Sequence, residues 1–345
     1  MKLVTVIIVN WNSGEMLARC LERLAEQTRP PDSVMIVDNA STDDSLAHAG
    51  KPADNVTLLQ MQTNLGFAAG NNRALAQCDT EFAALLNPDV FPENDWLEQM
   101  LAAARTHPEA AAFGSRQLCN ENPEILDGIG DIYHASGLAW RDRYGERQRE
   151  QDLVPREIFS PCAAAALYRL RALRDAGGFD EDFFCYLEDV DLGFRLRLAG
   201  YKALYVPSAV VHHAGSASTG GQWSDFAVYH GYRNPVWVFV KNMPGALFWI
   251  LLPLHIVFNL ASFPASVFLF PERNRGKLLL RAKTDALKGL PQMWSKRRRI
   301  QAGRTASVFD IWKVLDKRIR IPVQPHVQKR TEPEEPQTTG RNNVR

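Results

Sequence analysis

Polar side chains that could do chemistry stand at the carboxyl ends of apolar runs in this sequence. Asn10 follows the first such run, and Asp38 and Asn39 follow the second. A carboxylate just beyond a buried strand can accept hydrogen bonds from the N–H groups of a ligand, such as a pyrimidine edge. The same residues are also typical of a turn that leads into a helix, with Ser41 as the capping residue.

A second candidate segment, residues 64–72, is rich in glycine and asparagine and includes Asn64, Gly66 and Asn72. Glycine lets a ligand approach the backbone closely, and the N-terminus of a following helix suits an anionic group such as a diphosphate. The alternative is that the segment only forms an ordinary left-handed turn. Three asparagines in nine residues favour a binding role.

A third candidate is the tripeptide that contains Asn87 and Asp89, which follows another strand-like run. Its oxygens suit a hard divalent cation that bridges two phosphates of a leaving group. His213 follows a later strand-like run and could be a further metal ligand, with His212 as the open alternative. Asn-Pro-Asp is also a common turn sequence, so this tripeptide and the histidine indicate a metal site only when they are taken together.

The fourth candidate is an acidic segment in which six carboxylates fall within residues 180–191, interleaved with phenylalanine and tyrosine. Aromatic surroundings desolvate a carboxylate and raise its pKa, which makes it a better base near neutral pH. Asp191 is spaced for a structural ion pair with Arg195. Glu188 and Asp189 are therefore the candidates for a general base, and a solvated start of a helix is the alternative.

The elements that must position these side chains alternate between strand and helix over residues 1–115. Alternation of this kind predicts an α/β domain with a mostly parallel sheet, which binds ligands at the carboxyl ends of its strands. Residues 116–160 have no clear pattern and predict an irregular loop near the substrate. The predicted strands are residues 3–9, 33–38, 56–60 and 82–86, and the predicted helices are residues 13–27, 71–76 and 96–105.

Composition places the chain among ordinary globular proteins, because its 345 residues are 46% hydrophobic and 23% charged. The five cysteines are scattered and include no CxxC pair. This pattern argues against a disulfide framework or a zinc cluster and fits a reducing compartment. The apolar run at the N-terminus is too short for a signal peptide.

The C-terminal part differs in charge and hydropathy from the rest. Residues 246–270 contain no Asp, Glu, Lys or Arg, and residues 271–345 carry 19 Lys and Arg against 7 Asp and Glu. Residues 1–270 carry 21 against 32. A single membrane span would export the basic part, which contradicts the positive-inside tendency. We therefore expect a re-entrant or interfacial segment with basic residues on anionic lipid.

Other interpretations of this part remain open. Residues 246–270 could be a buried helical hairpin of a soluble protein. The basic run of residues 296–299 could bind nucleic acid, but nothing around it resembles a recognition module, so no nucleic-acid partner is expected. We predict a membrane-associated helical region at residues 246–320 and a disordered tail at residues 321–345.

Taken in order, these segments resemble the family 2 glycosyltransferases, in particular their rhamnosyltransferase-like branch, over residues 3–245. The resemblance implies a GT-A fold for residues 1–245 and sugar transfer with inversion. It is carried by Val-Ile-Ile-Val-Asn-Trp-Asn, Val-Asp-Asn-Ala-Ser-Thr-Asp, Asn-Leu-Gly-Phe-Ala-Ala-Gly-Asn-Asn, Leu-Asn-Pro-Asp, Gly-Gly-Phe-Asp-Glu-Asp-Phe-Phe and Glu-Asp-Val-Asp-Leu.

The resemblance also implies a role for each candidate residue. Asp189, next to Glu188, would be the general base. Asp89 would hold Mg²⁺ or Mn²⁺ at the donor diphosphate, with His213 near the metal. Residues of the donor site would be Asp38 at the base, Asn10 and Asn39 beside it, Asn64, Gly66 and Asn72 along the donor, and Asn87 in place of the first acid of an Asp-x-Asp motif.

The branch further implies the substrates and the place of action. The donor would be dTDP- or UDP-linked, with dTDP-L-rhamnose as the suggested example. The acceptor would be a lipid-linked saccharide or polysaccharide of the cell envelope, met at the cytoplasmic face of the inner (plasma) membrane. Cys162-Ala163-Ala164 stands where relatives often carry Ser-Gly-Ala, which leaves backbone contacts on the acceptor side open. The alternative is a non-catalytic sugar-nucleotide-binding or scaffold protein.

Overall fold

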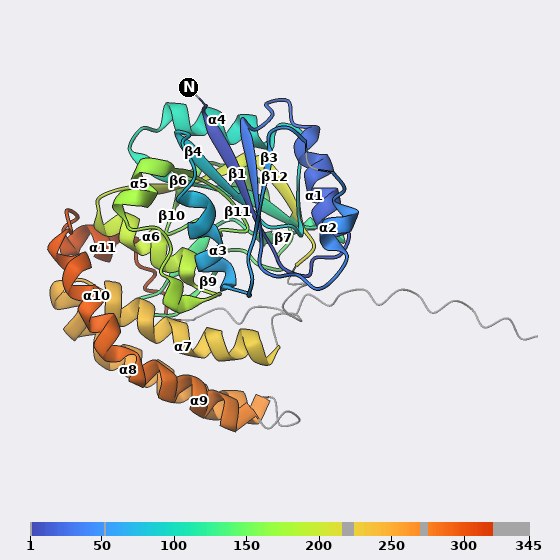
Figure 1. Cartoon of the computed structure of the whole chain (residues 1–345). Helices are drawn as coiled ribbons and strands as arrows, with labels where there is room; N and C mark the ends of the chain where they lie inside the picture. The colour runs from blue at the N-terminus through green and yellow to red at the C-terminus, as the bar shows by residue number, and fades with distance from the viewer. Residues whose placement is uncertain (1, 52, 216–223, 270–274, 320–345) are drawn as a thin grey trace, which may run out of the picture.

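The computed structural model describes residues 2–51, 53–215, 224–269 and 275–319, and its centre is a twisted sheet between helices (Figure 1). One half of the sheet is parallel, in the order β4-β1-β2-β3. Its strands match the predicted ones within a residue or two. They are β1 (Val4–Asn10), β2 (Ser33–Asp38), β3 (Val56–Gln60) and β4 (Phe82–Leu86).

The other half of the sheet is mixed, so the prediction of a mostly parallel sheet is wrong. β12 runs parallel to β6, but the pairs β11–β4, β11–β6, β10–β12, β12–β5 and β6–β7 are all antiparallel. The prediction assumed that the strand–helix alternation of the first strands continues along the chain. After β4, however, strands often follow one another without a helix between them. These strands are β5 (Val90–Pro92), β6 (Ala110–Cys119), β7 (Asn122–Gly128), β10 (Arg156–Ile158), β11 (Ala165–Arg169) and β12 (Lys202–His213).

Helices cover both faces of the sheet because successive strand residues point to opposite sides. Val4, Val6 and Ile8 of β1 pack against α1 and α4, while Ile7 packs on the side of α3, α5 and α6. Each fully buried side chain of this kind contributes roughly 1.5–3 kcal/mol. The covering helices are α1 (Met16–Ala25), α2 (Ser45–His48), α3 (Gly66–Leu75), α4 (Trp96–Thr106), α5 (Leu170–Asp175) and α6 (Glu188–Leu198).

The segment predicted as an irregular loop, residues 116–160, instead adds strands and a small second sheet. Besides the end of β6, β7 and β10 it contains the hairpin of β8 (Asp131–Tyr133) and β9 (Ala139–Arg141), and the 3₁₀ helix η1 (Glu150–Leu153). These strands are short and carry charged residues without an alternating apolar pattern, which is why periodicity missed them.

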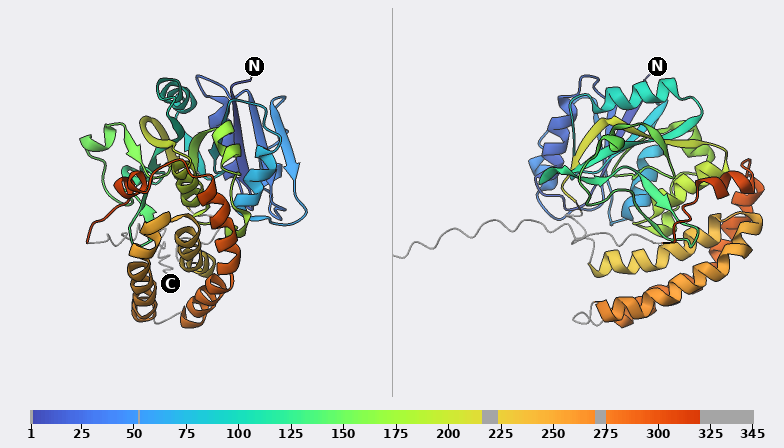
Figure 2. Two further views of the ribbon diagram at one scale, coloured as in Figure 1. Left: turned by 90° about the vertical axis from the view of Figure 1, so that its left-hand side faces the viewer. Right: turned by 180° about the vertical axis from the view of Figure 1, so that it is seen from behind.

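A bundle formed by the helices α7 to α11 follows the sheet and packs beside α6 (Figures 1 and 2). Phe183 and Phe194 share one core with Trp237, Met293 and Ile311 of the bundle. α7 lies within the predicted catalytic region yet packs on α9 and α10. The helices are α7 (Asp225–Asn242), α8 (Gly245–Leu269), α9 (Arg275–Lys288), α10 (Leu290–Ala302) and α11 (Val308–Val314).

The apolar segment of residues 246–270 is largely helix α8, which buries one side and exposes the other. Leu247, Leu251 and His255 are buried, whereas Trp249 and Leu260 are 64% and 69% exposed. No helix within the described ranges has the length and hydropathy needed to cross a bilayer. The predicted disordered tail lies outside the described residues, as does the end of the predicted basic region at residue 320.

Candidate active site

The register of β1 and β2 brings the first polar residues together at the carboxyl end of the sheet. Asn10 pairs with Asp38 across the strands. The Asn10 amide nitrogen donates to Asp38 Oδ1 at 2.9 Å and lies 3.1 Å and 3.0 Å from the hydroxyls of Ser41 and Ser45. Both Asn10 and Asp38 are buried. Asn10 therefore orients Asp38, whose carboxylate is the candidate hydrogen-bond partner for a nucleotide base.

Asn39 links this cluster to the glycine-rich segment. Its amide nitrogen donates to the Gly66 carbonyl at 3.0 Å. Its buried Oδ1 has no hydrogen-bond partner among the described residues, which marks it as an acceptor for a ligand. Asn64 caps the same turn, because its Oδ1 accepts from Gly66 N at 2.8 Å. Gly66 has φ +83°, and a Cβ there would lie 2.6 Å from the Phe184 carbonyl oxygen.

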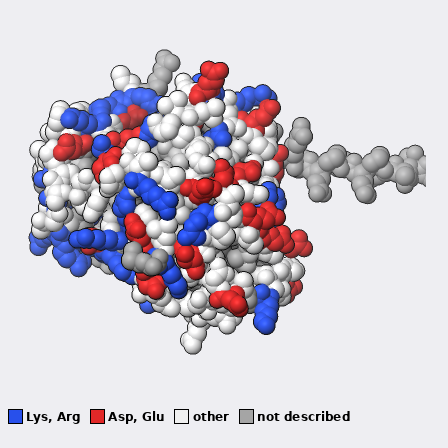
Figure 3. Space-filling view, turned by 90° about the horizontal axis from the view of Figure 1, so that it is seen from above, with Lys and Arg blue, Asp and Glu red and all other residues white. Residues whose placement is uncertain are grey.

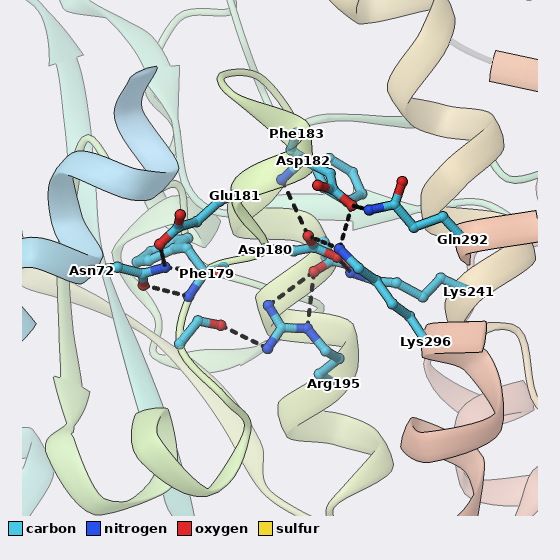
Figure 4. Close-up of polar contacts among 12 residues, drawn as sticks. Asn72, Phe179, Asp180, Glu181, Asp182, Phe183, Arg195, Lys241, Gln292 and Lys296 are labelled. Carbon is cyan, nitrogen blue, oxygen red and sulfur yellow. Dashed lines mark hydrogen bonds and ion pairs between the residues drawn. The ribbon is translucent and has the colours of Figure 1, made fainter. Parts of the chain in front are cut away.

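Asn72 has other partners than a donor. Its amide nitrogen donates to the Phe179 carbonyl and to Glu181, each at 2.9 Å, and its Oδ1 accepts from Phe179 N at 2.9 Å. Figure 4 shows these contacts beside the acidic segment. The side chain therefore ties α3 to residues 179–181, and contact between Asn72 and a donor stays a prediction that this geometry does not favour.

Asp89 and His213 meet through the pairing of β5 with β12, which sets His213 opposite Val90. His213 Nε2 lies 3.5 Å from Asp89 Oδ2. His212 pairs instead with Glu93 at 2.6 Å, so of the two histidines it is His213 that lies beside Asp89. The Asn87 backbone N–H donates to the Ala164 carbonyl at 2.8 Å, which fixes the turn that carries Asp89.

Asp127, at the end of β7, completes this side of the site and escaped the sequence analysis. Its Oδ2 lies 2.7 Å from His213 Nδ1 and also contacts Arg141 of β9. The signal that could have found Asp127 is weak, since β7 has no strand pattern. An imidazole held by a carboxylate on one nitrogen and free to meet a cation on the other is typical of metal-ligating histidines.

The charges of this group stabilise one another. Burial opposes ionisation of Asp127, but Arg141 and His213 lower its pKa to about 2. Burial likewise opposes protonation of His213, but Asp127 and Asp89 raise its pKa to about 10. Burial also opposes ionisation of Asp89, and His213 outweighs it, so the pKa of Asp89 is lowered. Both carboxylates therefore stay ionised at neutral pH.

A second group of carboxylates lies at the start of α6. Asp189 Oδ2 accepts from the Ala163 backbone N–H at 3.1 Å, and Oδ1 accepts from Val190 N at 2.8 Å. Burial raises the pKa of Asp189 in spite of these hydrogen bonds. Burial and the charge of Asp189 raise the pKa of Glu188 well above its usual range, and the same two causes do so for Asp131 of β8. Asp131 is a further residue that the sequence analysis missed.

Asp191 has the structural role that its spacing predicted. It pairs with Arg195 at 2.9 Å, with Lys241 Nζ at 2.6 Å and with the amide nitrogen of Asn242 at 2.7 Å. All four residues are buried. The carboxylate is thereby neutralised inside the protein, so it is unsuited to take a proton from a substrate.

Two further carboxylates of the acidic segment, Asp180 and Asp182, contact the helical bundle. Lys241 of α7 and Lys296 of α10 both bind Asp180, and Lys296 also binds Asp182 (Figure 4). A cavity of about 610 Å³ opens beside these ion pairs. These contacts are not apparent from the sequence, because Lys241 and Lys296 lie 61 and 116 residues from Asp180.

The fold and the two carboxylate groups define a nucleotide-sugar transferase, and comparison with known proteins agrees. Residues 5–177 match the sequence profile of glycosyl transferase family 2, and residues 94–270 match glycosyl transferase family group 2. The chain is 33% identical over 244 residues to the N-acetylglucosaminyl-diphospho-decaprenol L-rhamnosyltransferase of Mycobacterium tuberculosis, covering 62% of this chain and 77% of that one. The chain therefore belongs to glycosyl transferase family 2.

Its place within the family is the rhamnosyltransferase-like branch, as the resemblance implied, and its activity is that of a glycosyltransferase. The pre-mycofactocin glycosyltransferase of Mycobacterium tuberculosis is 32% identical over 265 residues, 73% of this chain and 53% of that one. Two solved structures confirm the GT-A fold. One is a mannosyltransferase from Pyrobaculum calidifontis in complex with GDP-Man and Mn²⁺, with a TM-score of 0.53 and 18% identity over 90% of this chain and 88% of that one. The other is S. aureus TarS, residues 1–349, with a TM-score of 0.55 and 17% identity over 90% of each chain.

Proposed function

We propose that this glycosyltransferase moves a hexose, with L-rhamnose from dTDP-rhamnose as the leading candidate, onto a hydroxyl of a lipid-linked saccharide in cell-envelope synthesis. The observation that carries the proposal is the placement of Asp189. The half-buried Asp189 carboxylate, whose pKa is raised, is held by the Ala163 N–H in the same GT-A domain as Asp38. The name of the mycobacterial relative, a rhamnosyltransferase that acts on a decaprenol-linked sugar, supports the choice of substrates.

The chemistry is a single displacement with inversion. Asp189 takes the proton of the acceptor hydroxyl while that oxygen forms a bond to the anomeric carbon. The bond from the anomeric carbon to the diphosphate oxygen breaks, and the nucleoside diphosphate leaves with the electron pair. One base on the acceptor side, with no second carboxylate acting as a nucleophile, favours inversion. Burial and the charge of Asp189 raise the pKa of Glu188, which favours the uncharged form of Glu188 beside the base.

The donor is bound by groups that the fold has already oriented. Asp38 is held by Asn10 and accepts from the nucleotide base. Asn39 Oδ1, which has no partner in the part of the chain that the structure describes, accepts from the base or the ribose. The N-terminus of α3, reached through Asn64 and Gly66, suits the diphosphate. These roles follow the order of the segments in the family.

A divalent metal, Mg²⁺ or Mn²⁺, fits Asp89 and His213 in part. The carboxylate and imidazole are close enough to share one ion, but no cluster of three or more His, Cys, Asp or Glu side chains within the described residues forms a metal site. We infer that the donor diphosphate supplies further ligands, in keeping with Asn87 in place of an acid. When bound, the ion neutralises charge on the leaving diphosphate. His213 would release its proton on binding it.

The cytoplasmic face of the membrane is the proposed place of action. Trp249, Ile256, Val257 and Leu260 of α8 are exposed at spacings that set them on one helix face. On α9, which packs on α8, Leu280 and Leu287 are exposed among Lys277, Arg281 and Lys288. A mixed apolar and basic surface is typical of helices that lie on anionic lipid.

The distribution of charge on the opposite face of the molecule also favours α8 and α9 as the surface that binds the membrane. The face seen in Figure 3, on the opposite side from α8 and α9 in Figure 1, mixes acidic and basic side chains without a field of one sign. We propose peripheral or re-entrant binding of residues 246–320 through α8 and α9, with anionic lipid as the partner. Nucleic acid is not part of the proposed function.

A screen of nucleotide sugars tests the function. Purified protein is incubated with each donor, Mg²⁺ or Mn²⁺, and a polyprenyl-diphosphate-linked N-acetylglucosamine acceptor, and nucleoside diphosphate release is measured with product mass. Acceptor-dependent release from one donor supports the proposal. Tight donor binding with no release from any donor would favour the scaffold alternative.

A further inference from the structure

The short loop that leads into α6 has an unusual backbone. Phe184, Tyr186 and Leu187 have φ of 64°, 67° and 65°. Side chains other than glycine rarely adopt this left-handed region, and such residues persist only where surrounding groups hold them. The loop begins at the end of the 3₁₀ helix η2 (Glu181–Phe183) and ends where Glu188 and Asp189 open α6. Whatever holds this loop therefore determines where the two carboxylates lie.

One buried side chain, Asn234 of α7, contacts three backbone carbonyl groups at this loop. Its amide nitrogen lies 3.3 Å from the Phe183 carbonyl oxygen, 3.0 Å from that of Cys185 and 2.6 Å from that of Tyr186. Asn234 is fully buried. Its Oδ1 accepts from Arg233 Nε at 2.8 Å, which orients the amide so that its N–H groups face the loop.

The rest of the loop is held from two sides. The guanidinium of Arg233 donates to the carbonyls of Asp182 and Phe183 at 3.1 Å and 3.0 Å. From the donor side, Ala68 N of α3 donates to the Phe184 carbonyl at 3.2 Å. The carbonyls of residues 182–186 are thus all engaged, by α7 or by the helix that begins at the donor segment.

We propose that Asn234 is a positioning residue for the sugar-transfer reaction: it fixes the loop so that the Asp189 carboxylate stays on the Ala163 N–H, facing the acceptor. The proposal rests on the proposed function, in which Asp189 is the general base. Asn234 touches no substrate. Losing its three contacts lets the left-handed residues relax, and the start of α6 turns with them. Displacement of a catalytic group by about 1 Å costs on the order of 10²-fold in rate.

The test compares two asparagines of the same helix. Asn242 is also fully buried on α7, but its amide binds the Asp191 carboxylate and not the loop. Asn234→Leu and Asn242→Leu each remove one buried amide at nearly constant volume. We expect Asn234→Leu to lower kcat about 10²-fold with the donor KM within about twofold of wild type. We expect Asn242→Leu to lower the Tm about as much as Asn234→Leu does, while its kcat stays within about threefold of wild type.

The pH profile separates positioning from loss of stability. In Asn234→Leu the acidic limb of kcat should shift, because the surroundings of Asp189 change, and in Asn242→Leu it should stay in place. Should Asn234→Leu not fold, Asn234→Gln keeps the amide but displaces it by one methylene, and a loss of kcat of about tenfold at unchanged donor KM is expected.

Wild-type kcat and pH profile in folded Asn234→Leu or Asn234→Gln would overturn the proposal, as would equal losses of kcat in both leucine variants. Failure of the proposed function looks different, because Asp189→Asn would then retain transfer whatever the state of Asn234.

Discussion

His213 Nδ1 lies 2.7 Å from Asp127 Oδ2, and this pair joins the end of β12 to the end of β7. The contact leaves Nε2 on the side of Asp89, 3.5 Å away. A carboxylate that fixes the orientation of an imidazole is as important to a metal site as the ligands themselves, since its loss lets the ring turn. Asp127 is therefore the residue outside the family motifs that should matter most for the metal.

Asp127→Asn should weaken Mn²⁺ binding in the presence of nucleoside diphosphate by about 10- to 100-fold. The control is Glu93→Gln, because Glu93 pairs with the adjacent His212 in the same way but away from Asp89. Electron paramagnetic resonance of free Mn²⁺ measures binding directly, without reference to turnover. Equal affinity in wild type and Asp127→Asn would show that the pair has only a structural role.

The activity should fall on the acidic side at a higher pH than an ordinary aspartate would give. Burial raises the pKa of Asp189, and only the ionised carboxylate can take a proton. As pH falls through this raised pKa, the base becomes protonated and kcat declines. The measurement is kcat at saturating donor and acceptor across the pH range in which the protein stays folded. A profile that is flat down to the usual pKa of aspartate would contradict the assignment.

Donor binding should depend on the Asp38 carboxylate. Asp38→Asn can keep the hydrogen bond from Asn10 but loses the charge that favours a base N–H, so the Kd for nucleoside diphosphate should rise about 10- to 100-fold. Asp43→Asn is the matched control, since Asp43 lies in the same segment but is exposed. Isothermal titration calorimetry gives both values. A similar Kd in wild type and Asp38→Asn would remove Asp38 from the donor site.

Membrane binding should depend on the exposed face of α8. Replacing Trp249, Ile256 and Leu260 by serine should lower binding to vesicles of phosphatidylglycerol and phosphatidylcholine at least about tenfold. Leu153 and Val154 are exposed to a similar degree at the end of η1, so their serine variants form the control. Co-sedimentation that is unchanged in the α8 variant, or already absent in the wild type, would refute this surface.

Local patterns predicted the parallel half of the sheet and the polar residues at its edge. Alternation of β-rich runs and helices located β1 to β4, and the polar residues that follow strands fell at one edge because carboxyl ends of parallel strands meet there. The spacing of Asp191 and Arg195 likewise predicted an ion pair that the structure contains. All of these inferences rest on residues close together in the chain.

Long-range contacts explain what the sequence did not reveal. Asp127 and Asp131 lie on strands without apolar alternation, and their roles depend on pairing with β6 and on distant Ser160. Asn72 belongs to a motif of the family, yet its partners Phe179 and Glu181 are more than a hundred residues away. The left-handed backbone at Phe184, Tyr186 and Leu187 costs about 1–3 kcal/mol for each residue and has no signature in the sequence, because none of the three is glycine.

The central claim is that Asp189 is the base that drives sugar transfer, and one comparison tests it most directly. Transfer from the donor that the screen identifies is measured for wild type, for Asp189→Asn and for Asp175→Asn, which changes an exposed carboxylate at the end of α5. We predict that Asp189→Asn loses about 10²- to 10⁴-fold in kcat while it binds the donor as tightly as wild type, and that Asp175→Asn is unaffected. Near-normal turnover of Asp189→Asn would contradict the account.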